Sequence, residues 1–369
     1  MSKNYYSLGL MSGTSMDGVD VSIIKSDGDI EFKGIFNKYF EYSDDFSKKI
    51  LKIRDKINNT KDLNLYSKEL NNIEKEITLF HAKVTNEAIK EVNSNIDIIG
   101  FHGQTIFHSA KEMVSKQLGD GKLLSQETKK KVVYDFRQND LKNGGEGAPL
   151  APIFHKLISE KIKVEPPLCV INLGGIANIT SIESGEISDL GSQDIGPGNC
   201  LIDEWIKKNT DKKYDKDGFI AKSGKKDILI LNQALDNHDN LKKKNILSYD
   251  TKDFDVSFVR GLSLEDGAAT LTDFTGRIIG AALFTLISDV REKFFKVLVC
   301  GGGRKNKTLL NKIKNRTLKN LVLQPIDDYG IDGDFVESQA FAYLAIRSLI
   351  NEPISFPDTT GCSKPSTGG

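Results

Sequence analysis

The sequence predicts an α/β protein of about two domains. Its 369 residues exceed the roughly 250 to 300 residues at which a single hydrophobic core stops growing. Apolar strands at residues 170–173 and 297–300 each run into a glycine turn and then into a stretch of helical periodicity. A strand, a glycine-rich tip and a return strand also occur twice, in SLGLMSGTSMDGVDVSII and in LCVINLGGIANITSIES. The two hairpins indicate two related halves that face one nucleotide.

Composition argues against several classes of protein. The 51 basic and 51 acidic side chains cancel, so no net charge attracts nucleic acid or an anionic membrane. The longest useful apolar run, residues 278–287, is far shorter than the roughly 20 residues needed to span a bilayer. The first residues lack the apolar core of a signal peptide, and the four cysteines lack metal-ligand or disulfide spacing. We therefore expect a cytoplasmic protein.

The first domain is expected to span residues 1–137 and to begin with a β-hairpin. A strand at residues 5–11 runs into the turn of GLMSGTSMDGVD, and the chain resumes as a strand at residues 19–24. Apolar residues then recur at helical spacing, and a later buried strand ends in the loop HGQTIFH. The remaining elements expected in this domain are helices at residues 48–57 and 71–91 and strands at residues 96–101 and 131–136.

The second domain is expected to span residues 138–369. It opens with the glycine loop NGGEGAPL, whose residues 143–147 offer a hinge. Pro149 suits the first turn of a helix at residues 151–159. We expect a C-terminal helix at residues 335–349 to lie beside a cleft between the domains.

The turn of the first hairpin is a candidate phosphate site. Gly13 and Gly18 can take positive φ and let the backbone approach a ligand closely, while N–H groups and the hydroxyls of the turn supply donors. Asp17 and Asp20 are candidate magnesium ligands. The alternative is an ordinary hairpin that contains glycine. The hydroxyls of the turn that would donate to phosphate belong to Ser12, Thr14 and Ser15.

Two further glycine loops follow strands, where open α/β sheets bind ligands. Gly174 and Gly175 at the tip of NLGGIANIT form a second candidate phosphate clamp. Gly301, Gly302 and Gly303 suit close approach to adenosine or ribose. The chain lacks both the G-x-G-x-x-G spacing at this loop and G-x-x-x-x-G-K-[ST] anywhere, so a Rossmann dehydrogenase and a P-loop NTPase are disfavoured.

Three charged residues are candidates for the reacting centre. Asp194 in QDIGPGN precedes a glycine turn and a helix, where a carboxylate can take a proton from water or a hydroxyl. Arg137 follows an apolar strand and suits a phosphate or carboxylate contact. Glu337 opens the helix VESQAFAYLAIR. Each has a structural alternative. Asp194 could cap a helix or form a turn, Arg137 could form an ion pair, and Glu337 could interact favourably with the helix dipole.

Other polar residues near these loops are candidates for substrate binding. His102 and His108 in FHGQTIFH are expected to line the substrate pocket, and metal ligation is disfavoured because no third Cys or His ligand is nearby. Gln104 from the same segment and Asn172 from the second hairpin are further expected substrate contacts.

Taken together, the motifs resemble those of the anhydro-N-acetylmuramic acid kinases, in order and over nearly the whole chain. They are GLMSGTSMDGVD, GFHGQTIFH, DFRQNDLKNGGEGAPL, INLGGIANIT, DIGPGN, the glycine loop at residues 301–303 and PDTTG. The resemblance implies two RNase-H-like domains of the actin-like and sugar-kinase superfamily, with ATP, magnesium and sugar held in a cleft between them. It also implies that water opens the 1,6-anhydro ring while O6 is phosphorylated, giving N-acetylmuramic acid 6-phosphate for cell-wall recycling.

The resemblance also assigns roles to individual residues. Asp194 would be the base that activates water, and Arg137 and Glu337 would line the reacting centre. One carboxylate and one cationic clamp suffice in principle, because phosphorus receives the departing oxygen and no second carboxylic acid must protonate it. The ATP phosphates would be held by Gly13, Thr14, Ser15, Met16, Asp17, Gly18, Val19 and Asp20.

Two positions depart from the expected pattern. Many relatives in the wider superfamily place an Asp just before the first Gly-Thr, whereas this chain has Ser12, so magnesium must be held elsewhere or through water. Ile195 stands where the family usually has Thr beside the catalytic Asp, so a hydroxyl is lost there. We expect this to affect the tuning of the base, not the activity itself.

Two alternative functions follow from the same motifs. Another sugar or acetate kinase of the superfamily would phosphorylate a free hydroxyl without opening a ring. A nucleotide-dependent regulatory or chaperone module would turn over no small substrate. We expect a small amino sugar as the partner molecule, neither nucleic acid nor membrane, and leave a homodimer open.

Overall fold

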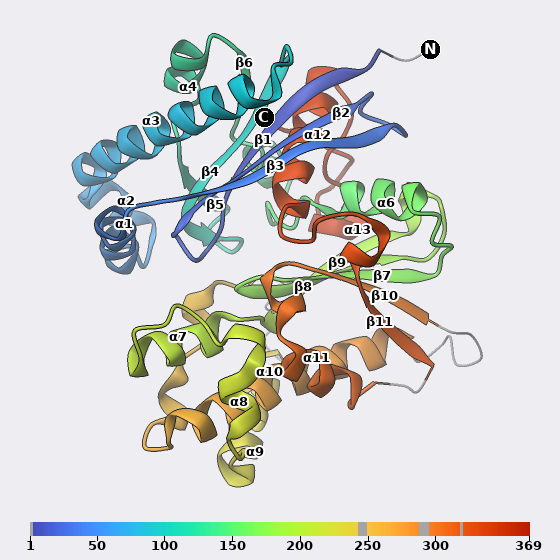
Figure 1. Ribbon diagram of the computed structural model, residues 1–369. Helices are drawn as coiled ribbons and strands as arrows, with labels where there is room; N and C mark the ends of the chain where they lie inside the picture. Colours follow the sequence, from blue (N-terminus) through green and yellow to red (C-terminus); the bar gives the residue numbers. More distant parts are fainter. Residues whose placement is uncertain (1–2, 243–248, 288–294, 318–319) are drawn as a thin grey trace. The chain divides into compact units, whose positions relative to one another are not determined.

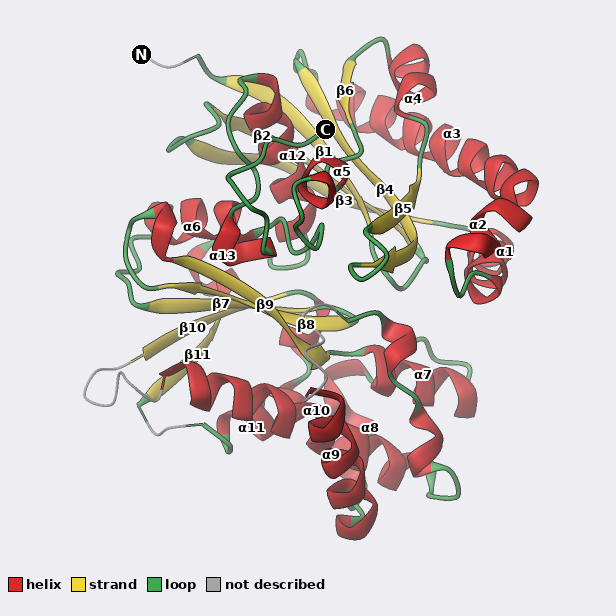
Figure 2. Cartoon of the chain, turned by 180° about the vertical axis from the view of Figure 1, so that it is seen from behind, coloured by secondary structure: helices red, strands yellow, loops and turns green. Residues whose placement is uncertain are grey.

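The computed structural model describes residues 3–242, 249–287, 295–317 and 320–369. It is a mixed α/β protein with two separate sheets (Figures 1 and 2). The chain divides into two compact units, and each contains one of the sheets. Unit 1 comprises residues 1–165, 185–191 and 335–369, and unit 2 comprises residues 166–184 and 192–334.

Unit 1 is built around a six-stranded sheet in the order β3-β2-β1-β4-β5, with β6 also paired to β4. β2 runs antiparallel to β1 and β3, whereas β4 runs parallel to β1 and to β6. Its strands are β1 (Tyr5–Ser12), β2 (Gly18–Ser26), β3 (Phe32–Glu41), β4 (Ile98–Ser109), β5 (Val114–Leu118) and β6 (Lys131–Val133). Its helices are α1 (Asp44–Lys56), α2 (Thr60–Leu65), α3 (Ser67–Val92), α4 (Gly121–Thr128), α5 (Gln138–Lys142), α6 (Pro152–Lys161), α12 (Val336–Leu349) and α13 (Pro357–Thr360).

Alternation along β1 explains how helices cover both faces of this sheet. Leu8 and Leu10 are fully buried and belong to the hydrophobic core that includes α3. The residues that alternate with them, Ser7 and Gly9, face α12: Ser7 Oγ donates a hydrogen bond to Ala342 O at 2.7 Å. A Cβ on Gly9 would lie 1.9 Å from Ser338 O, so only glycine lets α12 pack this closely. Figure 1 shows α3 and α12 on opposite sides of the strands.

Unit 2 repeats the same arrangement of strands. Its five-stranded sheet has the order β9-β8-β7-β10-β11, in which β8 is antiparallel to β7 while β10 runs parallel to both β7 and β11. Its strands are β7 (Leu168–Leu173), β8 (Ile176–Ile182), β9 (Leu190–Pro197), β10 (Phe295–Cys300) and β11 (Leu321–Pro325). Its helices are α7 (Cys200–Asn209), α8 (Phe219–Ser223), α9 (Ile228–Lys242), α10 (Leu264–Ile287) and α11 (Lys307–Lys314).

The two sheets confirm the predicted fold class at the level of strand order. Reading outward from the hairpins, β3-β2-β1-β4-β6 in unit 1 corresponds to β9-β8-β7-β10-β11 in unit 2. The central strand of each is a long apolar strand whose antiparallel neighbour follows it directly in sequence. The two similar hairpins seen in the sequence are therefore equivalent elements of two related sheets, as the RNase-H-like expectation requires.

The path of the chain between the units differs from a simple division after residue 137. The chain enters unit 2 at Pro166, stays there apart from residues 185–191, and returns to unit 1 at Phe335, so α6 and α12 both belong to unit 1. The segment HGQTIFH is a continuation of β4, and the loop predicted there is wrong: Gln104 and His108 pair with β5. Extended backbone pairing with a later strand overrides the glycine in this segment.

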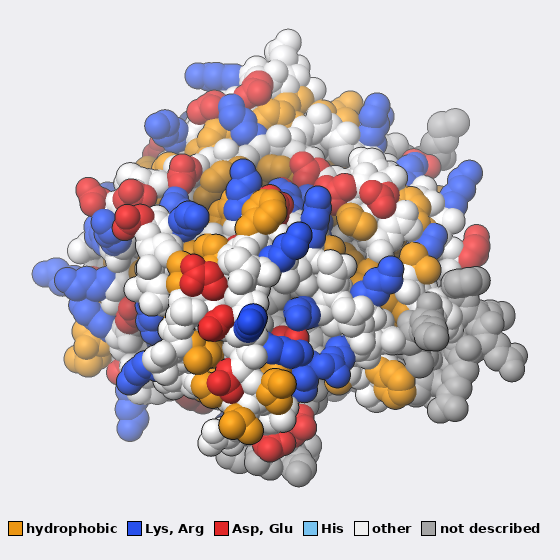
Figure 3. Space-filling model, turned by 60° about the horizontal axis from the view of Figure 1, so that its bottom comes forward, with side chains coloured by type: hydrophobic (Ala, Val, Ile, Leu, Met, Phe, Trp, Pro, Cys, Tyr) orange, Lys and Arg blue, Asp and Glu red, His pale blue; other side chains and the backbone are white. Residues whose placement is uncertain are grey.

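Two predictions from composition concern the distribution of charge and the presence of membrane-spanning helices. On the face shown in Figure 3, basic and acidic side chains are interspersed, as the equal numbers of the two charges favour. Within the described ranges, no helix is both long and apolar enough to cross a membrane.

Candidate functional site

The tip between β1 and β2 is a compact turn held from several directions. Met16 N donates to Gly13 O at 3.3 Å, and Met16 is 1% exposed with φ 56°, so its side chain anchors the turn in the core. Gln104 Nε2 donates to Gly13 O at 2.9 Å. Tyr42 N donates to Asp17 O at 2.8 Å. The tip is thus fixed at both ends while Thr14 and Ser15 stay exposed.

The glycines of this tip have different roles from the ones predicted. Positive φ was expected at Gly13 and Gly18 and is found instead at Met16, so that prediction is wrong. A Cβ on Gly18 would lie 2.5 Å from Phe40 O, so Gly18 is required for packing against β3. A Cβ on Gly13 would meet only Ser15 Oγ, at 3.9 Å. Gly13 therefore leaves open space beside the tip, which is what close approach of a ligand requires.

Two carboxylates accompany the tip. Asp17 Oδ1 accepts a hydrogen bond from Ser15 Oγ at 2.5 Å, and both Asp17 and Asp20 are half-buried. Asp20 on β2 is the cross-strand partner of Tyr39 on β3. Burial raises the pKa of Tyr39, and the charges of Asp17 and Asp20 raise it further. Among the described residues, no group of three Cys, His, Asp or Glu side chains could hold a metal ion by itself. The donor set fits Mg²⁺ bound through one or two carboxylates together with phosphate oxygens and water.

His102 and Arg137 form a second polar group in unit 1. The guanidinium of Arg137 donates from Nη1 to Gly147 O at 2.7 Å and from Nη2 to His102 Nε2 at 2.9 Å. His102 Nδ1 lies 2.8 Å from Gly103 O and must carry the proton, because a carbonyl only accepts. Burial and the charge of Arg137 lower the pKa of His102 well below its usual value. Neutral His102 therefore serves to orient Arg137.

The glycine loop beyond Arg137 is held by a residue that sequence reasoning did not select. Asp140 is 1% exposed, and its Oδ2 accepts from Gly147 N at 2.7 Å. Its Oδ1 accepts from Thr360 Oγ1, also at 2.7 Å, so the terminal PDTTG motif locks this loop. The available signal was an acidic residue next to a glycine cluster in a motif of the resemblance.

Glu337 lies in the first turn of α12 and is half-buried. Phe341, four residues later, shares its helix face. The Phe341 ring packs against the His102 ring with centroids 4.5 Å apart. Glu337 therefore belongs to the side of α12 that faces the His102–Arg137 pair.

In unit 2, three loops predicted from the sequence converge. Gly198 N donates to Gly175 O at 2.9 Å, and Asn199 N donates to Gly174 O at 2.8 Å. A Cβ on Gly198 would lie 2.3 Å from Gly174 O, which explains the glycine. The third loop meets them at Gly301, whose Cβ would lie 2.3 Å from Asn172 Oδ1. The structure thereby brings the second hairpin tip, the Gly-Pro-Gly segment and the triple-glycine loop together.

Asp194 lies in strand β9, four residues before this convergence. The expectation that it lies in a loop is wrong, because β9 continues to Pro197. As predicted, it precedes the Gly-Pro-Gly segment and a helix, α7, which begins at Cys200. Asp194 Oδ2 accepts a hydrogen bond from Tyr249 N at 3.0 Å, and the residue is half-buried. Ile195 beside it is 2% exposed and packs in the core. Apolar packing of Ile195 thus replaces the threonine hydroxyl that the family usually has at this position.

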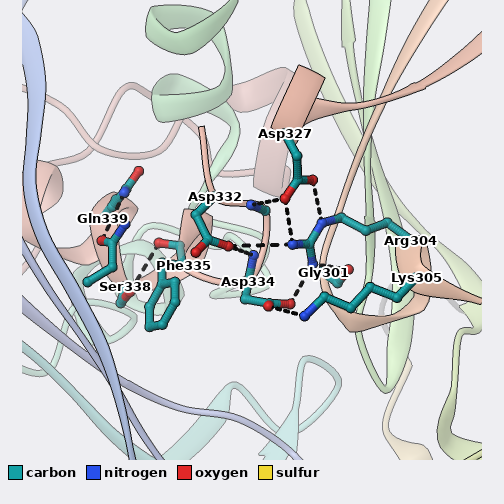
Figure 4. A network of polar contacts seen from close by, with 11 residues as sticks. Gly301, Arg304, Lys305, Asp327, Asp332, Asp334, Phe335, Ser338 and Gln339 are labelled. Carbon is teal, nitrogen blue, oxygen red and sulfur yellow. Dashed lines mark hydrogen bonds and ion pairs between the residues drawn. The ribbon is translucent and has the colours of Figure 1, made fainter. Parts of the chain in front are cut away.

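The triple-glycine loop is secured by Arg304, which is 6% exposed (Figure 4). Its guanidinium donates to both carboxylate oxygens of Asp327, at 2.6 and 2.8 Å, and also contacts Asp334. Arg304 Nη1 donates to Gly301 O at 3.1 Å. The hydrogen bond from Arg304 holds the pKa of Asp327 below its usual value. Sequence reasoning missed Arg304, although it directly follows the three glycines.

We expect Arg304→Lys to lower the free energy of unfolding by about 1 to 2 kcal/mol. An ammonium group cannot reproduce the fork that spans both Asp327 oxygens, and the partial exposure of that carboxylate limits the loss. Urea titration measures the change. Lys305→Gln is the matched control, because Lys305 pairs with Asp334 at the surface and such pairs contribute little. Equal effects of the two substitutions would show that the buried fork is unimportant.

Comparison with known proteins gives one consistent family. The family model "Anhydro-N-acetylmuramic acid kinase" matches residues 5–369. The anhydro-N-acetylmuramic acid kinase of Pelagibacter ubique is 56% identical over 100% of this chain and 98% of its own length. That of Zymomonas mobilis is 42% identical over 98% of both chains. Component A of (R)-2-hydroxyglutaryl-CoA dehydratase from Acidaminococcus fermentans, a solved structure, matches with a TM-score of 0.47 and 12% identity over 94% of this chain and 99% of that chain.

Proposed function

The chain belongs to the anhydro-N-acetylmuramic acid kinase family and is a phosphotransferase, and we propose that it couples ring opening to phosphorylation. In this proposal water opens the 1,6-anhydro ring of anhydro-N-acetylmuramic acid while the γ-phosphate of ATP is transferred to O6. The product is N-acetylmuramic acid 6-phosphate, which enters peptidoglycan recycling.

The observation that supports this proposal best is the convergence of loops at the end of the strand that carries Asp194. In unit 2, the second hairpin tip, the Gly-Pro-Gly segment and the triple-glycine loop join through close backbone contacts that only glycine permits. Strand β9 leads directly from Asp194 into this cluster. The proposed proton acceptor thus lies on the strand that ends at loops suited to phosphate and ribose, and the family match spans all of these segments.

The proposed mechanism assigns one task to each group. Asp194 takes a proton from the water that attacks the anomeric carbon. The electron pair of the broken C1–O6 bond remains on O6, which attacks the γ-phosphorus, so phosphorus takes the place of a proton on the leaving oxygen. Arg137, oriented by neutral His102, supplies positive charge for the phosphoryl group or the sugar carboxylate. Glu337 positions the sugar.

The first hairpin tip is proposed to bind the ATP phosphates through its N–H groups and the exposed hydroxyl of Thr14. The Ser12 hydroxyl, which was expected to contribute, is buried. Asp17 and Asp20 would hold Mg²⁺, directly or through water, and the metal would neutralise charge on the phosphates. Because ATP is the donor, we propose a cytoplasmic location. A homodimer remains a proposal that sedimentation velocity can test.

We expect ADP release with anhydro-N-acetylmuramic acid and little with N-acetylmuramic acid, which has no anhydro ring. A coupled assay for ADP with each sugar measures this. Equal activity on both sugars would favour a simple hydroxyl kinase. ADP release that depends on neither sugar would favour a regulatory or chaperone module.

A further inference from the structure

A buried chain of hydrogen bonds at the end of β1 has no role in the mechanism above. Ser12 Oγ lies 3.1 Å from His81 Nε2 on α3 and 3.1 Å from the Tyr42 hydroxyl, which follows β3. Ser12 is 1% exposed, His81 is fully buried, and Tyr42 is 3% exposed. Three polar side chains from three segments thus meet beside the proposed phosphate tip, shielded from water.

The direction of each hydrogen bond in this chain is determined by chemistry. His81 Nδ1 lies 2.8 Å from Ile77 O, and a carbonyl only accepts, so Nδ1 carries the proton. Burial lowers the pKa of His81 to about 4, so the ring is neutral near pH 7 and Nε2 is an acceptor. Ser12 therefore donates its only proton to His81. Tyr42 must then donate its hydroxyl proton to Ser12 Oγ.

The same residues hold the tip at both of its ends. Ser12 directly precedes Gly13, where the tip begins. Tyr42 reaches the other end, because its backbone N–H donates to Asp17 O at 2.8 Å. The proton of Ser12 is committed to His81, whereas the hydroxyl of Thr14 is exposed. The chain of side chains therefore spans the tip from behind and leaves its front to a ligand.

We propose that Ser12, His81 and Tyr42 are positioning residues that preorganise the first hairpin tip for the phosphates of ATP. This inference rests on the proposed function, in which the tip binds phosphate. A turn that is already fixed loses less conformational entropy when it binds, so affinity rises without any added contact to the ligand. An ionised aspartate at position 12 would have no proton for neutral His81, which gives a physical reason for serine here.

The test compares Ser12→Ala, His81→Gln and Tyr42→Phe with the unchanged protein. We expect KM for ATP, and Kd for a nonhydrolysable ATP analogue by calorimetry, to rise about 5- to 10-fold in each, the factor that one net hydrogen bond supplies. KM for the sugar and kcat should stay within about twofold, because the tip acts on nucleotide binding. Tyr42→Phe removes only one oxygen and keeps the inference testable where another variant fails to fold.

Two controls separate this role from general destabilisation. Thr85→Val changes a fully buried hydroxyl on the same helix that has no hydrogen-bond partner among the described residues, so its nucleotide affinity should be unchanged. Ser12→Thr keeps the hydroxyl and should keep most of the affinity. Unchanged nucleotide affinity in Ser12→Ala and Tyr42→Phe, or equal increases in both KM values, would overturn the inference. Failure of the unchanged protein to bind the analogue would instead refute the proposed function.

Discussion

Asp194→Asn should lower kcat at least about 100-fold and leave nucleotide affinity and thermal stability close to those of the unchanged protein. The amide oxygen of asparagine can still accept the hydrogen bond from Tyr249 N, now made at 3.0 Å, so the side chain keeps its place. It cannot take a proton from water. Steady-state ADP release with saturating ATP and anhydro sugar measures the loss.

The control for this prediction is Asp211→Asn, which makes the same chemical change at an exposed position just beyond α7. Its turnover should match that of the unchanged protein. Near-normal turnover in Asp194→Asn would remove Asp194 from the catalytic role. Loss of stability in Asp194→Asn would instead indicate that its contact with Tyr249 N is structural.

Gly13→Val should weaken binding of a nonhydrolysable ATP analogue at least about 100-fold, the largest expected effect on affinity. The reason is steric. A Cβ at Gly13 meets only Ser15 Oγ, at 3.9 Å, so the free protein should tolerate the side chain. The branched methyl groups would then occupy the space that the phosphates need, and a short Cα-to-phosphate approach would be lost. Calorimetric titration measures the affinity.

Two substitutions make this prediction specific to the tip. Gly185→Val places the same side chain in another open turn of unit 1, where a Cβ meets nothing within 4 Å, and should leave affinity unchanged. Gly18→Ala should destabilise the fold, because its Cβ would collide with β3. If Gly13→Val binds the analogue normally, the hairpin is a structural element only.

Local sequence patterns were sufficient to predict much of the fold. Strict apolar runs and glycine tips predicted both hairpins, and periodicity predicted α3 and α6 within a few residues. Local patterns could not predict which strands pair with one another or which helix packs on which sheet. HGQTIFH becomes strand because β5 pairs with it, and α12 returns to unit 1 because Gly9 lets the helix approach the sheet. The first contact needs a partner strand next along the chain, and the second needs a helix more than 300 residues away.

In the candidate site, too, local patterns predicted some features, and features that depend on a partner were missed. Loops with several glycines were readily selected, and the structure brings three of them together in unit 2. The buried side chains that support the glycine loops were missed: Arg304 in unit 2, and Asp140 and His81 in unit 1. A buried polar residue within a helix or beside a loop has no distinct pattern in one sequence. Its partner must be known before its role can be assigned.

Mass spectrometry of the sugar product is the most direct test of the proposed reaction. The protein is incubated with ATP, magnesium and anhydro-N-acetylmuramic acid, and the product mass is compared with that of the starting sugar. Ring opening coupled to phosphorylation predicts an increase equal to one phosphoryl group plus one water molecule. An increase of one phosphoryl group alone would contradict it, because the anhydro ring would then have remained closed.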